Sequence, residues 1–378
     1  SDVEALLARL AVAAGTPLLD RTEVALAAGP LGWRLNGSRD EQGVRIDAHF
    51  LIDATGEYGL APRTLGIRSE PERLKTNSRT LFAHFADLKR WREILEARGG
   101  RTDEHPFDCD HAALHQVIDE GWMYQLRFNN GVTSAGFVLA ADEHPLDPAR
   151  PIQHEWDALL ARYPDLAEQF RSARVAAPAG GLVRTGRLQR RHSQLAGPNW
   201  ALLPHTAGFI DPLHSTGIAQ SLCGIQRLAQ ALEHHWQSPS LEPALRRYEA
   251  ALWRELDLID QLVSACYLAR RTPRLFAACT MLYFAAAHTS ETRRLAGKLP
   301  PGEGFLCADD PRFRSLVQQT WQQVHALSRQ QTIEVTALQA FETELAAALG
   351  PYNTAGLLDP SAHNLYRCTQ IDKGRLAR

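Results

Sequence analysis

The chain has 378 residues, of which 44% are hydrophobic, enough to bury a large core divided into two or three packed units. Charged residues make up 22% and the formal net charge is −2, which argues against recruitment by nucleic acid or by a membrane surface. Six scattered cysteines without a CxxC pair argue against a zinc site or a disulfide framework. No apolar run reaches the roughly 20 residues that span a bilayer, so we expect a cytoplasmic protein without a metal site.

The first part of the sequence predicts a helix followed by short strands. Apolar residues repeat with a helical period over 2–14. The segment 17–24 has a strand-like composition. Two further strands are predicted over 32–35 and 44–52, on either side of a polar turn at 36–43.

The rest of the sequence is first mixed and then helical. The expected elements are strands over 81–85, 121–128, 131–139 and 200–203, a helix over 91–97, and an almost entirely helical region from residue 218 onward. This order is typical of a nucleotide-binding domain that is interrupted by a sheet insertion and followed by a helical region. We therefore predict an α/β fold with an α+β insertion. Its expected parts are a nucleotide-binding domain over 1–67 and 190–235, a mixed α/β substrate domain over 68–189, and a C-terminal helical region over 236–378.

The strand expected at 44–52 runs directly into Asp53-Ala54-Thr55-Gly56. In open α/β sheets, ligands bind at the carboxyl ends of the strands. A glycine there lets the backbone approach a cofactor closely. The same four residues would also suit an ordinary turn after a strand, so this motif alone decides nothing.

A second unusual segment joins the strand at 200–203 to the helix that begins near Ile218. The connecting loop contains Gly208, Pro212 and Gly217 and ends in Ser215-Thr216-Gly217, a sequence suited to capping a helix. A helix start carries unpaired backbone N–H groups that attract anions or an electron-rich ring. The alternative is a capped structural helix without a ligand.

A third segment is the predicted strand over 121–128, in which Trp122 and Tyr124 lie on the same face. Asn130-Gly131 then predicts a hairpin turn. Aromatic residues at this spacing line either a substrate pocket or, more often, a core.

Taken together and in this order, the three segments resemble the flavin-dependent halogenases, which are related to the group A FAD-dependent monooxygenases. The most specific match is FIDPLHSTGI over 209–218. The resemblance implies an FAD-binding, glutathione-reductase-like Rossmann-type domain. No GxGxxG occurs in the chain, so this domain is expected to be truncated at its front. We expect about 100 further residues, including a strand–GxGxxG–helix unit, to be encoded upstream of Ser1, and this chain alone to bind FAD weakly or not at all.

The resemblance also implies roles for individual residues. The expected cofactor-binding residues are Ala54, Thr55, Gly56, His205, Gly208, Asp211, Pro212, Ser215, Thr216 and Gly217. The N–H groups of Thr216 and Gly217 would meet the flavin edge or a chloride or bromide ion, and Trp122 and Tyr124 would line the substrate pocket. The family uses FAD reduced by a separate flavin reductase, together with O₂, to deliver hypohalous acid to an electron-rich aromatic ring.

Two histidines stand where the family has other residues. Pro204-His205 replaces the usual Gly-Asp before the flavin loop, so His205 is either a substitute polar contact or a buried structural histidine. His214 occupies the position of a glutamate in tryptophan-type halogenases. It is the candidate catalytic residue if it transfers protons near neutral pH, and otherwise it is a loop residue bonded to backbone.

Three functions are consistent with these residues. The first is an FAD-dependent oxidoreductase, halogenase- or monooxygenase-like, that acts on an aromatic or other apolar small molecule using reduced flavin and O₂. The second is a prenyl-reductase-type flavoprotein. The third is a non-catalytic remnant that has lost FAD binding.

Overall fold

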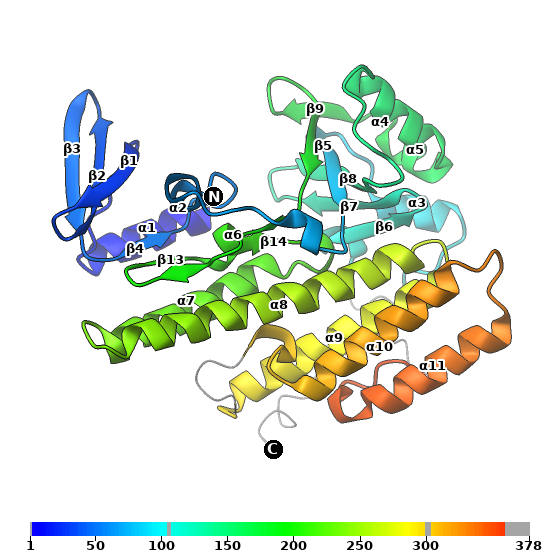
Figure 1. The fold of residues 1–378 in the computed structure, drawn as a ribbon. Coiled ribbons are helices and arrows are strands. Elements are labelled where there is room, and N and C mark those ends of the chain that lie inside the picture. The colour runs from blue at the N-terminus through cyan, green and yellow to red at the C-terminus, as the bar shows by residue number, and fades with distance from the viewer. Residues whose placement is uncertain (1, 104–106, 299–303, 360–378) are drawn as a thin grey trace.

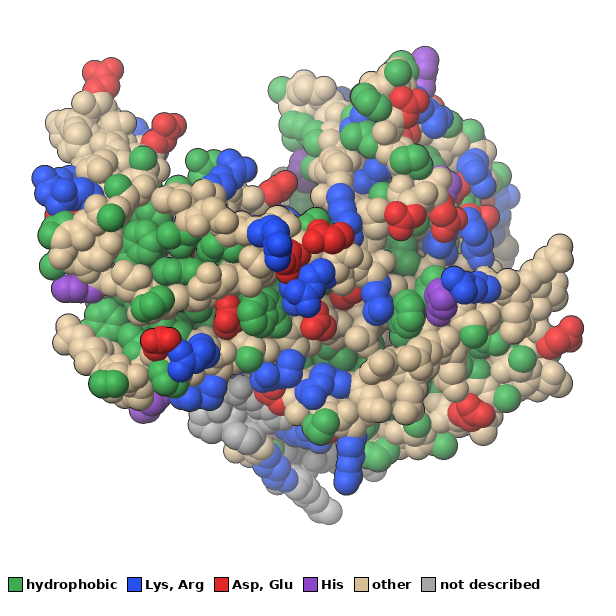
Figure 2. Space-filling model, viewed as in Figure 1, with side chains coloured by type: hydrophobic (Ala, Val, Ile, Leu, Met, Phe, Trp, Pro, Cys, Tyr) green, Lys and Arg blue, Asp and Glu red, His purple; other side chains and the backbone are tan. Residues whose placement is uncertain are grey.

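The computed structural model describes residues 2–103, 107–298 and 304–359. Two β-sheet regions lie side by side above a layer of long helices (Figure 1). In the described ranges no helix is long and apolar enough to cross a membrane. Five cysteines there are free, and Cys368 lies outside the described ranges. Acidic and basic side chains are interspersed on the face shown in Figure 2, in keeping with the near-zero net charge.

The chain begins with the expected helix, α1 (Asp2–Ala13), followed by a three-stranded antiparallel sheet in the order β1-β2-β3. The strands are β1 (Glu23–Gly29), β2 (Gly32–Arg39) and β3 (Gln42–Ala48). The strand predicted at 17–24 is wrong, because pairing begins only where Glu23 meets Ser38 of β2.

The polar turn predicted at 36–43 is also too long. The β2 and β3 strands pair as far as Arg39 and Gln42, so the turn contracts to Asp40 and Glu41, which have φ values of 48° and 66°. Polar residues are tolerated in these strands because much of the small sheet faces solvent.

The strand predicted at 44–52 divides into β3 and the short β4 (Leu51–Asp53). This β4 strand pairs in parallel with β13 (Trp200–Leu202), which pairs in turn with β12 (Ala196–Gly197). Among the described strands β4 has no partner on its other edge. A core of buried residues that includes Trp33, Trp200 and Leu202 lies beneath these strands.

The second sheet region is built on a six-stranded sheet in the order β10-β5-β8-β7-β6, with β9 also paired to β5. Its strands are β5 (Ser78–Ala86), β6 (Leu114–Ile118), β7 (Gly121–Arg127), β8 (Thr133–Ala140), β9 (Arg174–Ala177) and β10 (Val183–Arg187), and its helices are α3 (Trp91–Ala97), α4 (Ile152–Ala161) and α5 (Pro164–Phe170). A core centred on Trp156, Phe85, Phe137 and Phe170 joins sheet and helices. The predicted strands and helix of this region are confirmed.

The predicted helical region is confirmed for the described residues. It comprises α7 (Gly217–His235), α8 (Leu241–Ala269), α9 (Pro273–Leu295), α10 (Pro311–Ser328) and α11 (Val335–Leu349). The apolar face of α8 joins two cores, since Tyr248 packs with the β4–β13 region and Val263 packs with α9 and α10. The α7 helix leaves Ile218 and Leu222 exposed, at 79% and 61% of their surface.

Short elements complete the fold around α7. They are α2 (Leu60–Leu65), β11 (Arg190–Arg191), α6 (Pro204–Ala207) and β14 (Gly208–Phe209), and β14 pairs with β11. Gly224 of α7 lies directly on Pro204 of α6, because an added Cβ would stand 2.3 Å from the Pro204 Cγ.

We expect Gly224→Ala to lower the free energy of unfolding by about 1–3 kcal/mol, because the added methyl group overpacks the contact between α6 and α7. Chemical denaturation would measure the change. The matched control is Gly217→Ala on the same helix, where an added Cβ meets no atom within 4 Å. Equal stability of the two variants would contradict the packing argument.

Candidate functional site

The carboxyl ends of the parallel strands β4 and β13 lie together at one edge of the sheet, since Asp53 is in register with Leu202. The buried Asp53 carboxylate organises the turn that follows. Its Oδ1 accepts hydrogen bonds from the Thr55 backbone N–H (2.8 Å) and hydroxyl (2.7 Å), and its Oδ2 accepts one from the Ala61 N–H (2.6 Å). Ala54 and Thr55 are consequently exposed at the edge. Asp53 belongs to the motif noted in the sequence but was not among the residues predicted to bind the cofactor.

Gly56 and His205 are neighbours at this edge. Gly56 has a φ of 60°, which favours glycine, and its N–H donates to the Thr206 hydroxyl at 2.9 Å. An added Cβ would lie 3.3 Å from Cδ2 of the His205 ring. His205 itself is exposed, which is not the position of a buried structural histidine. Partial desolvation and nearby Arg190 lower the pKa of His205.

A small hollow beside the start of α7 brings together five of the residues predicted to bind the cofactor. They are His205, Gly208, Asp211, Thr216 and Gly217. Ile259 of α8 closes the far side.

The start of α7 is open rather than capped. Thr216 occupies the N-cap position without a side-chain hydrogen bond to the helix, and Ser215 before it has a left-handed φ of 51°. The prediction that Ser215-Thr216-Gly217 acts as a side-chain cap is therefore wrong. Gly217 faces open space, because an added Cβ meets nothing within 4 Å. A helix start of this kind presents its backbone N–H groups, and the positive end of its dipole, to a ligand.

Gly208 has a packing reason to lack a side chain. Its backbone is extended, with a φ of −173°, and an added Cβ would stand 2.7 Å from Cδ1 of Leu256 on α8. Pro212 begins a short helical turn, Pro212–His214, and is half-buried. Both residues shape the loop that leads to α7.

The carboxylate of Asp211 points into the protein. Its Oδ2 accepts hydrogen bonds from the Ser78 hydroxyl (2.6 Å) and the Tyr267 hydroxyl (2.9 Å), and its Oδ1 accepts one from the Leu213 N–H (3.0 Å). Burial raises the pKa of Asp211 to about 6. These partners commit the Asp211 carboxylate to the protein interior, while the residue also lines the hollow beside the start of α7, so its role in cofactor binding stays a prediction.

His214 is also buried. Its ring stacks on Tyr283 of α9 with a centroid distance of 4.1 Å and an interplanar angle of 6°, and its Nε2 lies 3.7 Å from the Cys266 sulfur. Burial lowers the pKa of His214 to about 3. The expected proton transfer by His214 near neutral pH is therefore not supported, because the ring stays neutral across that range.

The depressed pKa of His214 predicts a specific loss of stability in acid. A histidine with a folded pKa of about 3 and an unfolded value of 6.5 stabilises the fold fully above pH 6.5 and loses that stabilisation as the pH falls toward 3. Between pH 7 and pH 5 we expect the free energy of unfolding to fall by about 2 kcal/mol more in the wild type than in His214→Phe. Phenylalanine can keep the stacking on Tyr283 and does not titrate.

Denaturation at several pH values in both proteins would measure this difference. The raised pKa of Asp211 has the opposite effect, since its contribution is lost as the pH rises from about 4 to about 6. That contribution cancels in the comparison because Asp211 is present in both proteins. Parallel pH dependences would show that His214 does not titrate at the low pKa.

Trp122 and Tyr124 lie on β7 at the contact with α8. Trp122 is 2% exposed, its indole N–H donates to the Tyr267 hydroxyl at 3.2 Å, and its ring lies 4.6 Å from that of His115. Tyr124 is half-buried against the same core. This environment is that of a core residue for Trp122, so Tyr124 is the better candidate for a pocket wall.

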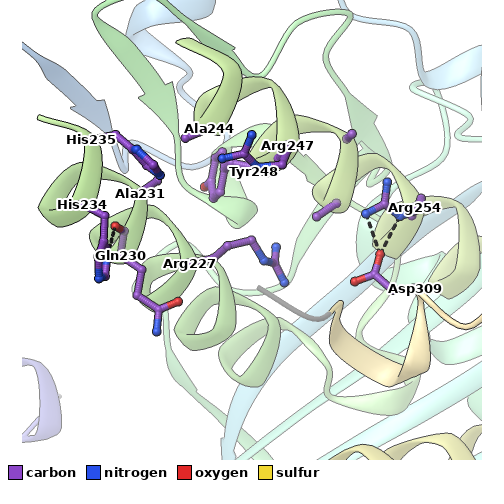
Figure 3. A pocket seen from close by; sticks show the side chains of 12 residues that line it. Arg227, Gln230, Ala231, His234, His235, Ala244, Arg247, Tyr248, Arg254 and Asp309 are labelled. Atoms are coloured by element: carbon purple, nitrogen blue, oxygen red, sulfur yellow. Dashed lines mark hydrogen bonds and ion pairs between the residues drawn. The ribbon is translucent and has the colours of Figure 1, made fainter. Parts of the chain in front are cut away.

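A groove of about 560 Å³ lies between α7 and α8 (Figure 3). It is lined by several basic residues, two of which are paired with carboxylates. Arg227 bonds to Glu255 at 2.6 Å, and Arg254 forms a bonded pair with Asp309 (Figure 3). The groove contributes none of the residues predicted from the sequence.

One group of possible metal ligands, Asp108, Cys109 and Asp110, occurs in the described part of the chain. The Asp110 carboxylate accepts hydrogen bonds from the Trp91 and Arg92 N–H groups at the start of α3 (2.9 and 3.0 Å). The Asp108 carboxylate is paired with Arg90. These contacts explain the cluster as a support for α3 without a metal.

The arrangement is that of an FAD-binding halogenase fold. The structure of halogenase PltM in complex with phloroglucinol and FAD matches it with a TM-score of 0.81 at 22% identity, over 96% of this chain and 76% of that chain. A family model described as tryptophan halogenase matches residues 1–278. The chain belongs to the tryptophan halogenase family.

Two curated relatives support the same family. Monodechloroaminopyrrolnitrin halogenase PrnC of Pseudomonas fluorescens is 30% identical over 311 residues, which cover 76% of this chain and 53% of the relative. Tetracycline 7-halogenase of Kitasatospora aureofaciens is 31% identical over 185 residues, covering 47% of this chain and 32% of the relative. The chain therefore spans about half of PrnC and about a third of the tetracycline halogenase.

Proposed function

We propose that the protein carrying this chain is an FAD-dependent halogenase, an oxidoreductase that uses reduced flavin and O₂ to halogenate an aromatic or other apolar small molecule. The observation that carries this proposal is the uncapped start of α7, where Gly217 faces open space in a hollow that His205 also lines. Unpaired N–H groups at a helix start favour anions and electron-rich groups, which suits both the edge of a flavin and a chloride or bromide ion.

Bound FAD would supply the oxidising chemistry, and this chain would supply part of its binding site. The residues proposed to hold it are Ala54, Thr55, Gly56, His205, Pro212, Ser215, Thr216 and Gly217. They fit the cofactor because no side chain covers the backbone at Gly56 and Gly217 and because His205 is exposed. Asp53 and Thr206 hold the turn at Gly56 in place through their hydrogen bonds with the Thr55 and Gly56 N–H groups.

The three-part organisation is likewise a proposal. Residues 1–67 and 190–235 would form the cofactor domain, residues 68–189 the substrate domain, and residues 236–378 the helical region. The contact between β7 and α8 would then lie between the flavin site and the substrate, with Tyr124 as a wall of the substrate site. A separate flavin reductase would deliver the reduced cofactor. The PltM complex with phloroglucinol and FAD and the halogenase relatives support an aromatic substrate.

The experiment is a halide-dependent product assay on the complete protein that carries this chain, because this chain alone is expected to bind FAD weakly or not at all. A flavin absorption spectrum first establishes cofactor binding. The protein is then incubated with reduced FAD, a flavin reductase, O₂ and a panel of phenols and pyrroles, with chloride, with bromide or without halide. We expect product masses that carry the halogen isotope pattern and change with the halide. A hydroxylated or reduced product formed without halide would instead identify a monooxygenase or a prenyl-reductase-type flavoprotein, and the lack of a bound flavin would indicate a remnant.

A further inference from the structure

Asp211 lies where three parts of the molecule meet. It lies in the loop that leads into α7. Its carboxylate accepts hydrogen bonds from the hydroxyl of Ser78 on β5 and from the hydroxyl of Tyr267 on α8. Its remaining oxygen accepts the N–H of Leu213 within the loop itself. Asp211 is 3% exposed, so solvent contributes little to this arrangement.

The direction of the hydrogen bond from Tyr267 is fixed by its other partner. The indole nitrogen of Trp122 is a donor only, so the Tyr267 oxygen must accept its proton at 3.2 Å. The hydroxyl proton of Tyr267 is then available for Asp211. A donor chain therefore runs from Trp122 through Tyr267 to Asp211.

The bond from Ser78 is fixed in the same way. The Ser78 backbone N–H donates to the Gln189 Oε1 at 2.9 Å, which places the amide Nε2 of Gln189 toward the Ser78 hydroxyl (2.8 Å) and the Ile210 carbonyl (2.6 Å). The Ser78 oxygen accepts from Gln189 and passes its own proton to Asp211. A second donor chain thus ends on the same carboxylate oxygen.

Two donor chains and a backbone N–H converge on one side chain, which must therefore only accept. An ionised carboxylate meets this requirement. The amide of an asparagine does not, because its NH₂ group is a donor and would face either the two donating hydroxyls or the donating Leu213 N–H. We propose that Asp211 is a positioning residue that fixes the start of α7, the proposed flavin site, relative to the strand that carries Trp122. Its effect on catalysis rests on the proposed function, whereas the mechanical link can be tested without flavin.

The test uses Asp211→Asn, Tyr267→Phe and the double variant. Hydrogen exchange of the loop 208–217 is measured in the flavin-free protein, and the visible flavin spectrum and kcat are measured in the loaded protein. Each single variant should speed exchange of the loop by about tenfold, as expected for one lost hydrogen bond. The double variant should be no worse than Asp211→Asn, because both changes break one chain.

Asp260→Asn is the matched control. Asp260 is a second buried aspartate and lies on α8. Its carboxylate accepts hydrogen bonds from the backbone N–H groups of Lys75 and Thr76 (2.7 and 2.9 Å) rather than from any group of the loop. It should lower the stability of the fold without changing loop exchange, the flavin spectrum or kcat. If Asp211→Asn behaves like this control, Asp211 is an ordinary buried carboxylate and the proposal is overturned.

The two proposals fail separately. A protein that binds no flavin would refute the proposed function, while the exchange measurements would still decide whether Asp211 holds the loop. Fully additive effects of Asp211→Asn and Tyr267→Phe would refute the donor chain even in an active halogenase. Tyr267→Phe, which removes a single hydroxyl, tests the chain if Asp211→Asn does not fold.

Discussion

Gly217→Val is expected to weaken flavin binding by about 10- to 100-fold, the equivalent of the 1–3 kcal/mol that a steric overlap costs. The valine methyl groups would occupy the space above the first turn of α7, where an added Cβ meets no protein atom within 4 Å. The fold should tolerate the change, because valine is a slightly better helix former than glycine. Fluorescence titration with FAD and thermal denaturation of the flavin-free protein would measure the two effects.

Gly43→Val provides the matched control for this substitution. Gly43 lies on β3, and an added Cβ there also meets nothing within 4 Å, so the same change is made away from the proposed site. Flavin affinity should be unchanged in this control. Normal flavin binding by Gly217→Val would contradict the proposal that the start of α7 forms part of the flavin site. A lowered melting temperature without flavin would instead mean that Gly217 is required by the fold.

Glu255→Ala is expected to lower the free energy of unfolding by about 3–5 kcal/mol. Glu255 is fully buried on α8, where it accepts hydrogen bonds from Arg227 of α7 (2.6 Å) and from the Phe305 N–H (2.7 Å). Removing the carboxylate leaves the buried Arg227 guanidinium without this counter-charge. Because Arg227 belongs to the helix whose start forms the proposed flavin site, flavin affinity should fall as well.

The comparison is with Glu242→Ala, which removes an exposed carboxylate from the same helix. Glu242 pairs with Arg246 one turn away, and both side chains are about 60% exposed. We expect this loss to be below about 1 kcal/mol, because solvent screens such pairs. Urea denaturation of both variants would show the difference. Similar losses would mean that burial does not strengthen the pair between Arg227 and Glu255.

Local patterns predicted several elements closely. The α3 helix was predicted with its observed bounds, and β7 and β8 to within about two residues, although β8 is buried at every position rather than alternately. The small β1–β3 sheet was misjudged because its polar residues also fit a turn. Long-range contacts account for the rest. The partners of Asp211 lie 133 and 56 residues away, and the pKa of His214 depends on burial against α9.

The residues of the proposed flavin site remain predictions, and the sequence could indicate only some of them. Strand ends and a helix start can be located from the chain, so Gly56, His205 and Gly217 were named together. Whether a side chain turns toward the site or away from it depends on its tertiary partners. That information was lacking for Asp211 and His214, which are both directed inward, and for Asp53, which supports the turn from beneath.

Among the described strands β4 is unpaired on one edge, and α7 leaves Ile218 and Leu222 exposed. Open strand edges and uncovered apolar side chains favour the association of identical molecules. We expect light scattering to show association that increases with concentration, and Leu222→Lys to reduce it while leaving the melting temperature unchanged. Handling the chain at low concentration, or with this surface made charged, would therefore keep binding measurements free of aggregation.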